Sequence, residues 1–527
     1  RFGPSELEVR SGWSVEYLLN PGRLYGANGI RAGADGRIYV AQLTGCRVSA
    51  IDIDSCEIEH LETVGGDIIG PDDLVFDDAG NLYVTEFTES RVSVREANGA
   101  TRILQGDVIG ANPITYHQGH LIAGECRHDA RIMELDRNGG APRIIVDHVP
   151  MTNAFEVGPD GKLYFPVMET NEIWRVNLDG SECEVVVGDL GVPDSVIFDS
   201  KGCIISTQVG RGQVLRIDPR SGERTLLADI GPGLDNSTFV GDRLFVSHMT
   251  GSIHEILAPG ELRELNPKGL LWPMGVAAAA DGSVYVADGS YAYVRPPGGK
   301  LGLVGMIFTP GYPGFHRGAA AAGNGEWFVT TSIGEVRRWN PASQDNELLA
   351  SGYDKLMSIA VAPGGTLVFA ESGTGRVLEL DRGEISIAAS GLDNPTGVAI
   401  GSDGKVYVSE SGAGRVVRLR GGKAEAVIDG LKLPEGLAIR GSKLYVIDVT
   451  TRELVEADLD TGARRTIVSG LPVGAPSGPR KYLGPAGEFS GPMVSFAGLA
   501  AGEDGTLYVG ADGNGSVMAI HPPIDRQ

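Results

Sequence analysis

Asn153-Ala-Phe-Glu-Val-Gly-Pro-Asp-Gly161, followed by Lys-Leu-Tyr-Phe, is the stretch that decides the fold of this chain. A near-copy follows it: Asp194-Ser-Val-Ile-Phe-Asp-Ser-Lys-Gly202, then Cys-Ile-Ile-Ser. In both copies a polar side chain stands eight residues before a turn glycine, and short apolar runs flank that turn. The pattern predicts a β-hairpin whose first strand begins at a polar residue.

The hairpin recurs along the whole chain roughly every 40 residues, the period of a β-propeller blade. In the first half every hairpin starts at Asn or Asp. We call these six residues the entry ring: Asn28, Asp72, Asn112, Asn153, Asp194 and Asn236. In the second half the corresponding residues share no chemistry: Met274, Arg317, Met357, Thr396, Glu435 and Ala497. Each repeat has room for four short strands, so we predict an all-β protein of two tandem six-bladed β-propellers.

Each propeller is expected to be closed by one borrowed strand. The strand predicted at Trp13 to Leu19 would complete the sixth blade of the first propeller, beside Ser252 to Leu257. Glu261 to Asn266 would complete the last blade of the second propeller, beside Ser516 to Ile520. The domains would then be residues 1–259 and 260–527, with the boundary at Pro259-Gly260.

Composition narrows the range of partners and compartments. The formal charge of −23 argues against nucleic acid or an anionic membrane as a partner, because phosphate binding needs clustered Lys and Arg. No apolar run reaches the length of a transmembrane helix. The five cysteines include no C-x-x-C pair, so we expect reduced thiols, which slightly favours a cytoplasmic location. The chain begins at Arg1 without a Met, and we expect its start to have been trimmed.

The entry ring predicts a metal site in the first propeller. Amide and carboxylate oxygens around one axis are hard ligands, which favours Ca²⁺, with Mg²⁺, Mn²⁺ or Zn²⁺ as alternatives. The competing interpretation is that Asn and Asp cap turn backbones at these positions, as both residue types often do. The uniformity of the first half, against the variety of the second, favours the ligand ring.

Residues 20–258 resemble the six-bladed SMP-30/gluconolactonase/luciferin-regenerating family and, more distantly, the diisopropylfluorophosphatase and paraoxonase propellers. The matching residues are Asn112, Asn153 in Asn-x-x-x-x-Gly-Pro-Asp-Gly, and Asp194 after Pro193. The family usually carries Glu-Gly-Pro where this chain has Asn28-Gly-Ile, so the site is less anionic unless Asp72 compensates. The resemblance implies divalent-metal-dependent hydrolysis of lactones or related esters. The second half is similar to NHL-type repeats, as in Asn-Pro-Thr-Gly-Val-Ala-Ile.

Such a mechanism needs a proton acceptor beside the metal. Our first candidate is His248, which ends a predicted second strand on the metal face; the alternative is a hydrogen-bonded histidine that holds a loop. Glu86 and Glu125 end the equivalent strands and could act as base, ligand or loop-fixing acceptor. The second half has acids at the same register without a metal ring: Asp288, Glu371, Glu410 and Asp448. The catalytic candidates are therefore His248, Glu86, Glu125 and Asp194.

The sequence therefore supports a metal-dependent lactonase-type hydrolase that acts on a small-molecule substrate in the first propeller. Two alternatives stay open. One is a metal-dependent lyase or isomerase on the same fold, since fold does not determine reaction type. The other is a non-catalytic tandem-propeller binding module in which the entry ring is structural. No oligomeric state is predicted.

Overall fold

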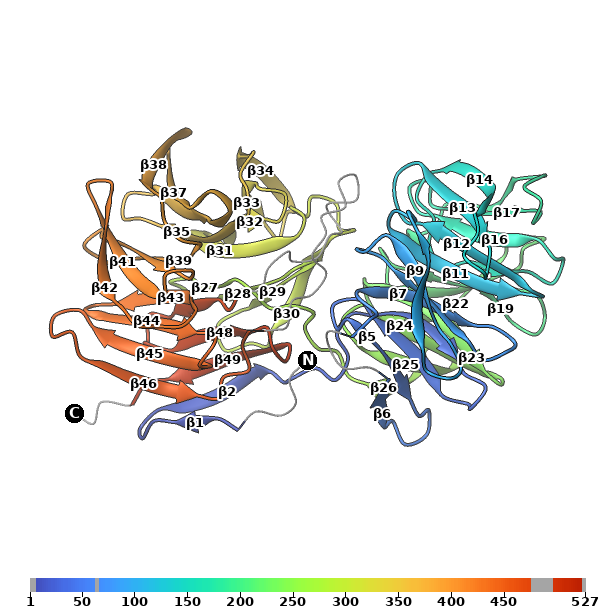
Figure 1. The fold of residues 1–527 in the computed structure, drawn as a ribbon, viewed down its shortest axis with the longest axis horizontal. Helices are drawn as coiled ribbons and strands as arrows, with labels where there is room; N and C mark the ends of the chain where they lie inside the picture. Colours follow the sequence, from blue (N-terminus) through green and yellow to red (C-terminus); the bar gives the residue numbers. More distant parts are fainter. Residues whose placement is uncertain (1–5, 62–65, 475–495, 524–527) are drawn as a thin grey trace. The chain divides into compact units, whose positions relative to one another are not determined.

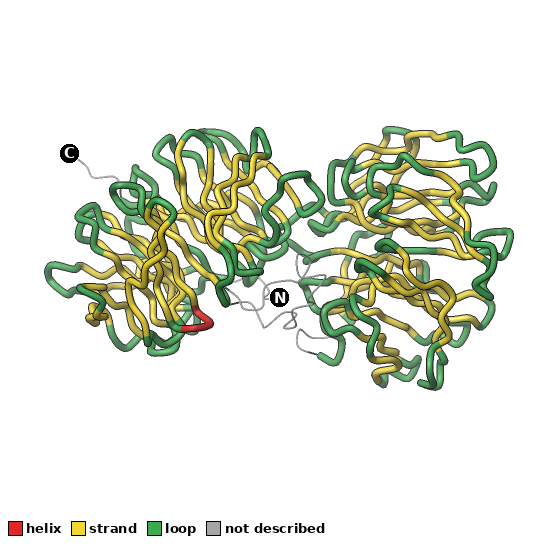
Figure 2. Tube along the Cα trace, turned by 90° about the horizontal axis from the view of Figure 1, so that it is seen from above, coloured by secondary structure: helices red, strands yellow, loops and turns green. Residues whose placement is uncertain are grey.

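The computed structural model describes residues 6–61, 66–474 and 496–523. In these residues the strands form twelve antiparallel sheets, and the helical structure is a single 3-10 turn at Ser372–Thr374 (Figure 1). Strands and loops make up nearly all of the traced chain (Figure 2). The prediction of an all-β protein is confirmed.

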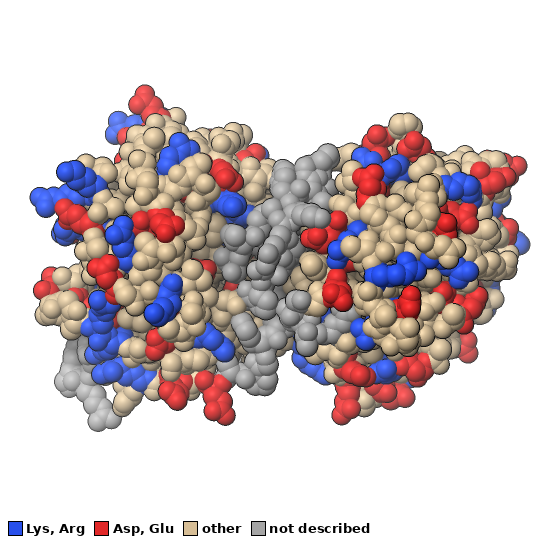
Figure 3. Space-filling model, viewed as in Figure 1, with Lys and Arg blue, Asp and Glu red and all other residues tan. Residues whose placement is uncertain are grey.

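The sheets fall into two compact units. The N-terminal unit is Gly22–Leu271. The C-terminal unit comprises the described residues on both sides of it: 6–21, 272–474 and 496–523. Acidic and basic side chains are interspersed over the visible face of each unit (Figure 3). All five cysteines are free, as expected. No helix in the described part of the chain is long and apolar enough to cross a membrane.

Six four-stranded sheets build the N-terminal unit. The first three are β3 (Ala27–Ala32), β4 (Ile38–Gln42), β5 (Arg47–Ile51) and β6 (Ile58–His60); β7 (Pro71–Phe76), β8 (Leu82–Glu86), β9 (Arg91–Arg95) and β10 (Thr101–Gly106); and β11 (Ala111–His117), β12 (His120–Glu125), β13 (Ala130–Leu135) and β14 (Arg143–Val149). The other three are β15 (Glu156–Val157), β16 (Leu163–Val167), β17 (Glu172–Val176) and β18 (Glu184–Val187); β19 (Pro193–Phe198), β20 (Ile204–Gln208), β21 (Gln213–Ile217) and β22 (Arg224–Asp229); and β23 (Leu234–Val240), β24 (Arg243–His248), β25 (Ile253–Ala258) and β26 (Glu261–Asn266).

Six further sheets build the C-terminal unit. The first three are β27 (Val276–Ala278), β28 (Val284–Asp288), β29 (Tyr291–Arg295) and β30 (Gly302–Met306); β31 (His316–Gly323), β32 (Glu326–Thr331), β33 (Val336–Asn340) and β34 (Asp345–Ala350); and β35 (Leu356–Val361), β36 (Leu367–Glu371), β37 (Arg376–Asp381) and β38 (Glu384–Ser390). The other three are β39 (Pro395–Ile400), β40 (Val406–Glu410), β41 (Arg415–Arg420) and β42 (Lys423–Ile428); β43 (Pro434–Arg440), β44 (Lys443–Asp448), β45 (Glu453–Asp458) and β46 (Arg464–Ser469), extended by β1 (Glu8–Val9); and β47 (Leu499–Ala501), β48 (Leu507–Ala511) and β49 (Ser516–His521) with β2 (Ser14–Leu19).

The first strands of the sheets contact one another in a closed cycle within each unit. In the N-terminal unit the cycle is β3, β7, β11, β15, β19, β23 and back to β3. Apolar layers fill the space between neighbouring sheets, and one of them joins the last sheet to the first through Phe245, Ile253, Ile30 and Val40. Burial of these alternating strand faces stabilises each sheet against its neighbours.

The predicted strand exchange is wrong in both places. Ser14–Leu19 pairs with Ser516–His521 in the C-terminal unit, and Glu261–Asn266 pairs with Ile253–Ala258 in the N-terminal unit. The reason is local: Gly260 has φ 81°, so Pro259-Gly260 forms the tight turn of a hairpin, and strands adjacent in sequence pair at small loop-closure cost. The chain passes between the units near residues 21–22 and 271–272, not at the expected boundary of 259–260.

Candidate functional site

A repeated break in strand pairing positions the entry ring. The register shifts between Ala27 and Ile30 in β3 and between Pro71 and Leu74 in β7, and equivalent shifts occur in β11, β19 and β23. In each case the predicted ring residue lies inside the irregularity. Asn153 lies between the isolated bridge of Thr152 and the first pair of β15. Such bulges turn side chains out of the alternation of the strand, which explains why the same sequence position carries polar groups in six sheets.

The structure brings the entry ring together in the interior. All six residues are buried, with 3–6% of their surface exposed. Nδ2 of Asn153 donates a hydrogen bond of 2.9 Å to Oδ1 of Asp194. The side chains of Asn28 and Asp72 are hydrogen-bonded. These links join the first sheet to the second and the fourth sheet to the fifth, as expected for side chains around one axis.

Sequence analysis missed three residues that join this cluster, namely Asp73, Asp235 and Cys126. Asp235 is hydrogen-bonded to Asp194, and Oδ1 of Asp73 accepts a 3.1 Å hydrogen bond from Nδ2 of Asn236. The thiol of Cys126 is hydrogen-bonded to Asn112, the third residue of the entry ring. The sequence does contain a signal for Asp73 and Asp235, namely the polar doublets Asp72-Asp73 and Asp235-Asn236, because a bulge presents two consecutive residues.

The cluster concentrates carboxyl groups where water does not reach. Burial raises the pKa of Asp72 well above its usual range, and the charges of Asp73 and Asp194 raise it further. Burial and the charge of Asp73 raise the pKa of Asp194 to about 7, and burial and the charges of Asp194 and Asp72 raise the pKa of Asp235 well above its usual range. Buried carboxylates repel one another unless protons or a cation compensate them. The site therefore favours binding of positive charge.

Two oxygen atoms in the cluster are buried and lack a hydrogen-bond partner within the described part of the chain: Oδ2 of Asp194 and Oδ1 of Asn236. Carboxylate and amide oxygens are the ligands that Ca²⁺ prefers. Within the described residues, no group of three or more His, Cys, Asp or Glu side chains is arranged to hold a metal ion. A cation here would have to use the Asn amides as well as the carboxylates, and the ring supplies four such amides.

Arg31 ties the cluster to its surroundings. Its Nη1 donates a 2.8 Å hydrogen bond to Oε2 of Glu156, and its Nη2 lies 3.7 Å from Oδ2 of Asp73. Nε and Nη2 also donate to the carbonyls of Leu74 and Ile114, at 3.2 and 3.0 Å. One guanidinium thus connects strands of four sheets and balances the charge of Asp73, whose pKa burial nevertheless raises to about 6.

His248 is held by hydrogen bonds on both ring nitrogens. Nε2 lies 2.9 Å from the carbonyl oxygen of Pro232, and Nδ1 accepts from the backbone N–H and the hydroxyl of Thr250, at 3.1 and 2.8 Å. Burial lowers its pKa to about 4, so the ring is neutral at pH 7. This arrangement matches the alternative of a histidine that holds a loop, and it leaves no nitrogen free to accept a proton from water.

Glu86 and Glu125 are buried partners of arginines. Glu86 accepts hydrogen bonds from Nε and Nη2 of Arg91 at 2.9 and 2.7 Å. Glu125 accepts from Nε of Arg127 at 2.9 Å and from Nε of Arg131 at 3.0 Å. With every carboxylate oxygen engaged, both residues match the loop-fixing role among the three that the sequence left open.

The side chain at the end of the second strand of a sheet also fixes a loop, and it does so in both units. The residue that ends the second strand accepts the backbone N–H of a residue 16 or 17 positions earlier. The donors and acceptors are Tyr25 and Gln42, Ile69 and Glu86, Ile109 and Glu125, Gly191 and Gln208, Trp272 and Asp288, Asp354 and Glu371, Asp393 and Glu410, and Lys432 and Asp448. Because this hydrogen bond recurs in the C-terminal unit, which lacks the entry ring, it is a structural feature of the repeat.

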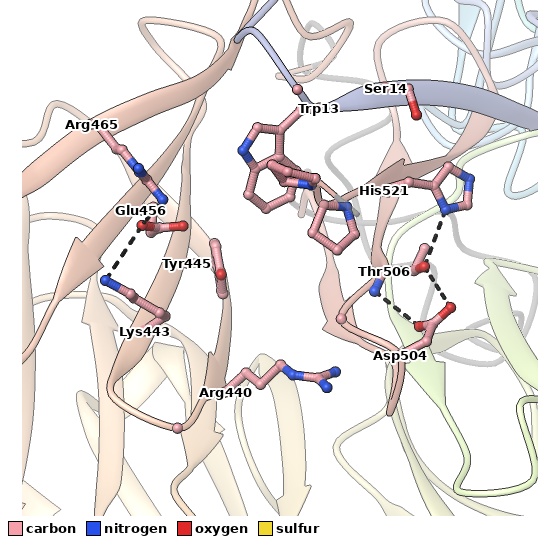
Figure 4. Close-up of a pocket in the computed structure, with 15 residues that line it drawn as sticks. Trp13, Ser14, Arg440, Lys443, Tyr445, Glu456, Arg465, Asp504, Thr506 and His521 are labelled. Atoms are coloured by element: carbon pink, nitrogen blue, oxygen red, sulfur yellow. Dashed lines mark hydrogen bonds and ion pairs between the residues drawn. The ribbon is translucent and has the colours of Figure 1, made fainter. Parts of the chain in front are cut away.

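An open pocket of about 1100 Å³ lies in the C-terminal unit, and Trp13, Tyr445 and His521 are among the side chains that line it (Figure 4). Its charges are largely paired: Glu456 lies between Lys443 and Arg465, with 2.7 Å between its Oε1 and Nη2 of Arg465. The pocket contains none of the residues that the sequence predicted for the site.

The family model for SMP-30/gluconolactonase/LRE-like regions matches residues 16–248 and 320–522 of this chain. The match therefore reaches far beyond residues 20–258, to which sequence motifs had limited the resemblance, while similarity to NHL-type repeats stays a prediction. A search of curated proteins returned no match.

Several solved structures are similar to parts of the chain. A calcium-binding regucalcin from Agrobacterium tumefaciens aligns at 18% identity over 47% of this chain and 96% of its own, with a TM-score of 0.37. A gluconolactonase from Xanthomonas campestris aligns at 16% identity over 49% and 91%, with a TM-score of 0.38. A streptogramin B lyase aligns at 19% identity over 56% and 99%, with a TM-score of 0.39.

Proposed function

Because the chain belongs to the SMP-30/gluconolactonase/LRE-like family, we propose that the N-terminal unit is a six-bladed β-propeller that hydrolyses a lactone or related ester. The hydrolysis depends on a divalent cation, Ca²⁺ in the first instance, and the C-terminal unit is a second six-bladed propeller. One observation carries the proposal: Asp72, Asp194 and Asp235 converge in a buried ring of amides, and Oδ2 of Asp194 is buried with no partner in residues 6–61, 66–474 and 496–523.

The residues present fit a hard cation. Asp194 and Asn236 each offer one unpartnered oxygen, and the entry ring contributes further amide oxygens, which suits the oxygen coordination of Ca²⁺. Asp72 supplies a second carboxylate, in place of the first-blade glutamate that Asn28 replaces. When bound, such a cation would polarise an ester carbonyl and lower the pKa of a coordinated water.

The chain's own groups orient the ligands and move the proton. The amide of Asn153 holds Oδ1 of Asp194 through its 2.9 Å hydrogen bond. This contact fixes the orientation of the carboxylate and therefore the direction of Oδ2. Asp235 shares a hydrogen bond with Asp194, and its pKa is raised by burial and by the charges of Asp194 and Asp72. Buried carboxyl groups with raised pKa values are candidates for acid–base roles in catalysis. We assign Asp235 the acid–base role for which the sequence had favoured His248.

The test is metal content and hydrolysis measured on the same preparations. Wild type, Asp194→Ala and the exposed-charge control Asp403→Ala would be purified without chelator, analysed for bound metals, and assayed on γ- and δ-lactones with and without EDTA. We expect one divalent ion in wild type and control, none in Asp194→Ala, and hydrolysis only where the ion is present. A protein that binds no Ca²⁺, Mg²⁺, Mn²⁺ or Zn²⁺ contradicts the metal mechanism and favours a binding module.

Metal binding without hydrolysis of any lactone would separate the two halves of the proposal. It would keep the cation site and exclude lactones and related esters as the substrate class. Elimination and isomerisation of small molecules would then be the reactions to assay, because the same fold supports more than one chemistry.

A further inference from the structure

Arg317 occupies the position of an entry-ring residue in the C-terminal unit. The pairing of β31 with β32 shifts between His316 and Ala319, as it does around the ring residues of the N-terminal unit. The first strands β27, β31, β35, β39, β43 and β47 again contact one another in a closed cycle. The bulge therefore directs a guanidinium toward the interior of that cycle, where the N-terminal unit has Asn and Asp.

The guanidinium of Arg317 is fully buried and poorly satisfied. Its exposed fraction is 0%. Nη1 donates to the carbonyl of Leu356 at 3.4 Å, whereas Nε and Nη2 have no hydrogen-bond partner among the residues that the structure describes. Arg31, the buried arginine of the N-terminal unit, uses Nε, Nη1 and Nη2 and reaches two carboxylates. The contrast shows that burial of an arginine in this fold does not by itself leave the guanidinium without partners.

Nε and Nη2 of Arg317 are the same two nitrogens with which other arginines of this chain bind carboxylates. Nε and Nη2 of Arg91 donate to Glu86 at 2.9 and 2.7 Å. Nε and Nη2 of Arg243 donate to Glu255 at 2.6 and 3.0 Å. Two parallel donors match the two oxygens of a carboxylate, which makes this contact specific as well as strong.

Among the described residues, Asp354 is the acid whose charge acts on Arg317, and it does not balance the buried guanidinium. Asp354 is itself exposed to water, which screens its charge. Glu435 occupies an entry position in β43, and burial and Asp512 raise its pKa to about 8, so it is mostly neutral at pH 7. Met357, at the entry position of the adjacent β35, is buried and apolar.

We propose that the interior of the C-terminal unit is a second ligand site, in which Nε and Nη2 of Arg317 bind the carboxylate of a small organic acid. The methionine and the neutral Glu435 of the surrounding first strands leave the guanidinium as the positive group that selects an anion. The site lies in the unit without the Asn/Asp ring, and it holds whether or not the N-terminal unit hydrolyses lactones.

Thermal stability of the metal-free full chain tests the site, with formate and acetate as probes and sodium chloride at equal ionic strength as reference. We expect Tm to rise with the logarithm of the formate or acetate concentration above Kd, by about 5 °C at 100 times Kd. Arg317→Met should abolish this rise, and Arg317→Lys should weaken the affinity about tenfold because it keeps the charge but loses the two-donor edge. Arg420→Met, an exposed cation of the same unit, should behave as wild type.

Direct binding to wild type keeps the test valid if the variants fail to fold. The NMR line of ¹³C-formate should broaden with added protein and sharpen again when acetate displaces it. An equal Tm response to chloride, a response unchanged in Arg317→Met, or a formate line that acetate does not sharpen would each overturn the carboxylate site.

Discussion

Asn153 and Asp194 face each other from neighbouring sheets, with 2.9 Å between Nδ2 and Oδ1, while Oδ2 of the same carboxylate is buried and finds no partner among the described residues. The contact shows how the fold builds its candidate site: one amide fixes the carboxylate, and the second oxygen stays available for a cation. The acids around it make the cluster unfavourable when no positive charge is bound.

Asp194→Asn should therefore stabilise the metal-free protein and remove its response to Ca²⁺. The amide keeps the size of the side chain but removes its repulsion with Asp235 and Asp72, so Tm in EGTA should rise. Wild type should gain Tm with added Ca²⁺ by mass action, and the variant should not. Calorimetric scans with EGTA and with Ca²⁺ measure both effects. A Ca²⁺-dependent gain that persists in the variant would show that Asp194 is not a ligand.

Glu125→Gln should cost stability and leave cation binding intact. The substitution leaves Arg127 and Arg131 without their shared buried carboxylate, which should lower the free energy of unfolding by about 3 kcal/mol. Glu410→Gln is the matched control, because Glu410 holds Arg415 and a backbone N–H in the same way in the other unit. Urea unfolding compares the two. Loss of turnover in folded Glu125→Gln, with Glu410→Gln unaffected, would return Glu125 to the list of catalytic residues.

Glu435→Gln should remove a pH dependence of the stability of the C-terminal unit. Burial and Asp512 raise the pKa of Glu435 from 4.5 to about 8, so the folded protein holds this proton more tightly than the unfolded chain. Stability from this group is complete below about pH 4.5 and is lost as pH rises toward 8. Gln cannot ionise, so near pH 9 the variant should be more stable than wild type, by an amount on the order of 3 kcal/mol. If the difference in the free energy of unfolding between wild type and Glu435→Gln stayed constant across this pH range, the raised pKa of Glu435 would be contradicted.

The observed strand pairing predicts how fragments fold. Gly22–Leu271 holds all four strands of each of its six sheets, so the fragment should fold alone, with a cooperative thermal transition and the circular dichroism of β-structure. Removal of residues 1–21 from the full chain should destabilise the C-terminal unit, because β47–β49 would lose the edge strand β2. Calorimetry of the truncated chain tests this. A fragment that folds only when residues 13–21 are included would instead support closure of the N-terminal unit by that strand.

The sequence alone determined the repeat and its polar positions. Asn28, Asp72, Asn112, Asn153, Asp194 and Asn236 could be found by counting back from a turn glycine, because hairpin turns and bulges are local features whose residues lie close together in the chain. The family resemblance rested on the same local motifs, and the family match confirms it.

Only the tertiary structure decided which strands pair across distance and which polar groups share one environment. Ser14–Leu19 fits any open sheet edge by pattern, and in the structure the hairpin at Gly260 pairs β26 with β25 and so occupies the edge that Ser14–Leu19 was expected to fill. Glu86 and Asp194 look equally suited to chemistry in one dimension. In three dimensions one is surrounded by arginine and backbone donors, and the other by buried acids, because burial and charge depend on neighbours that come from other sheets.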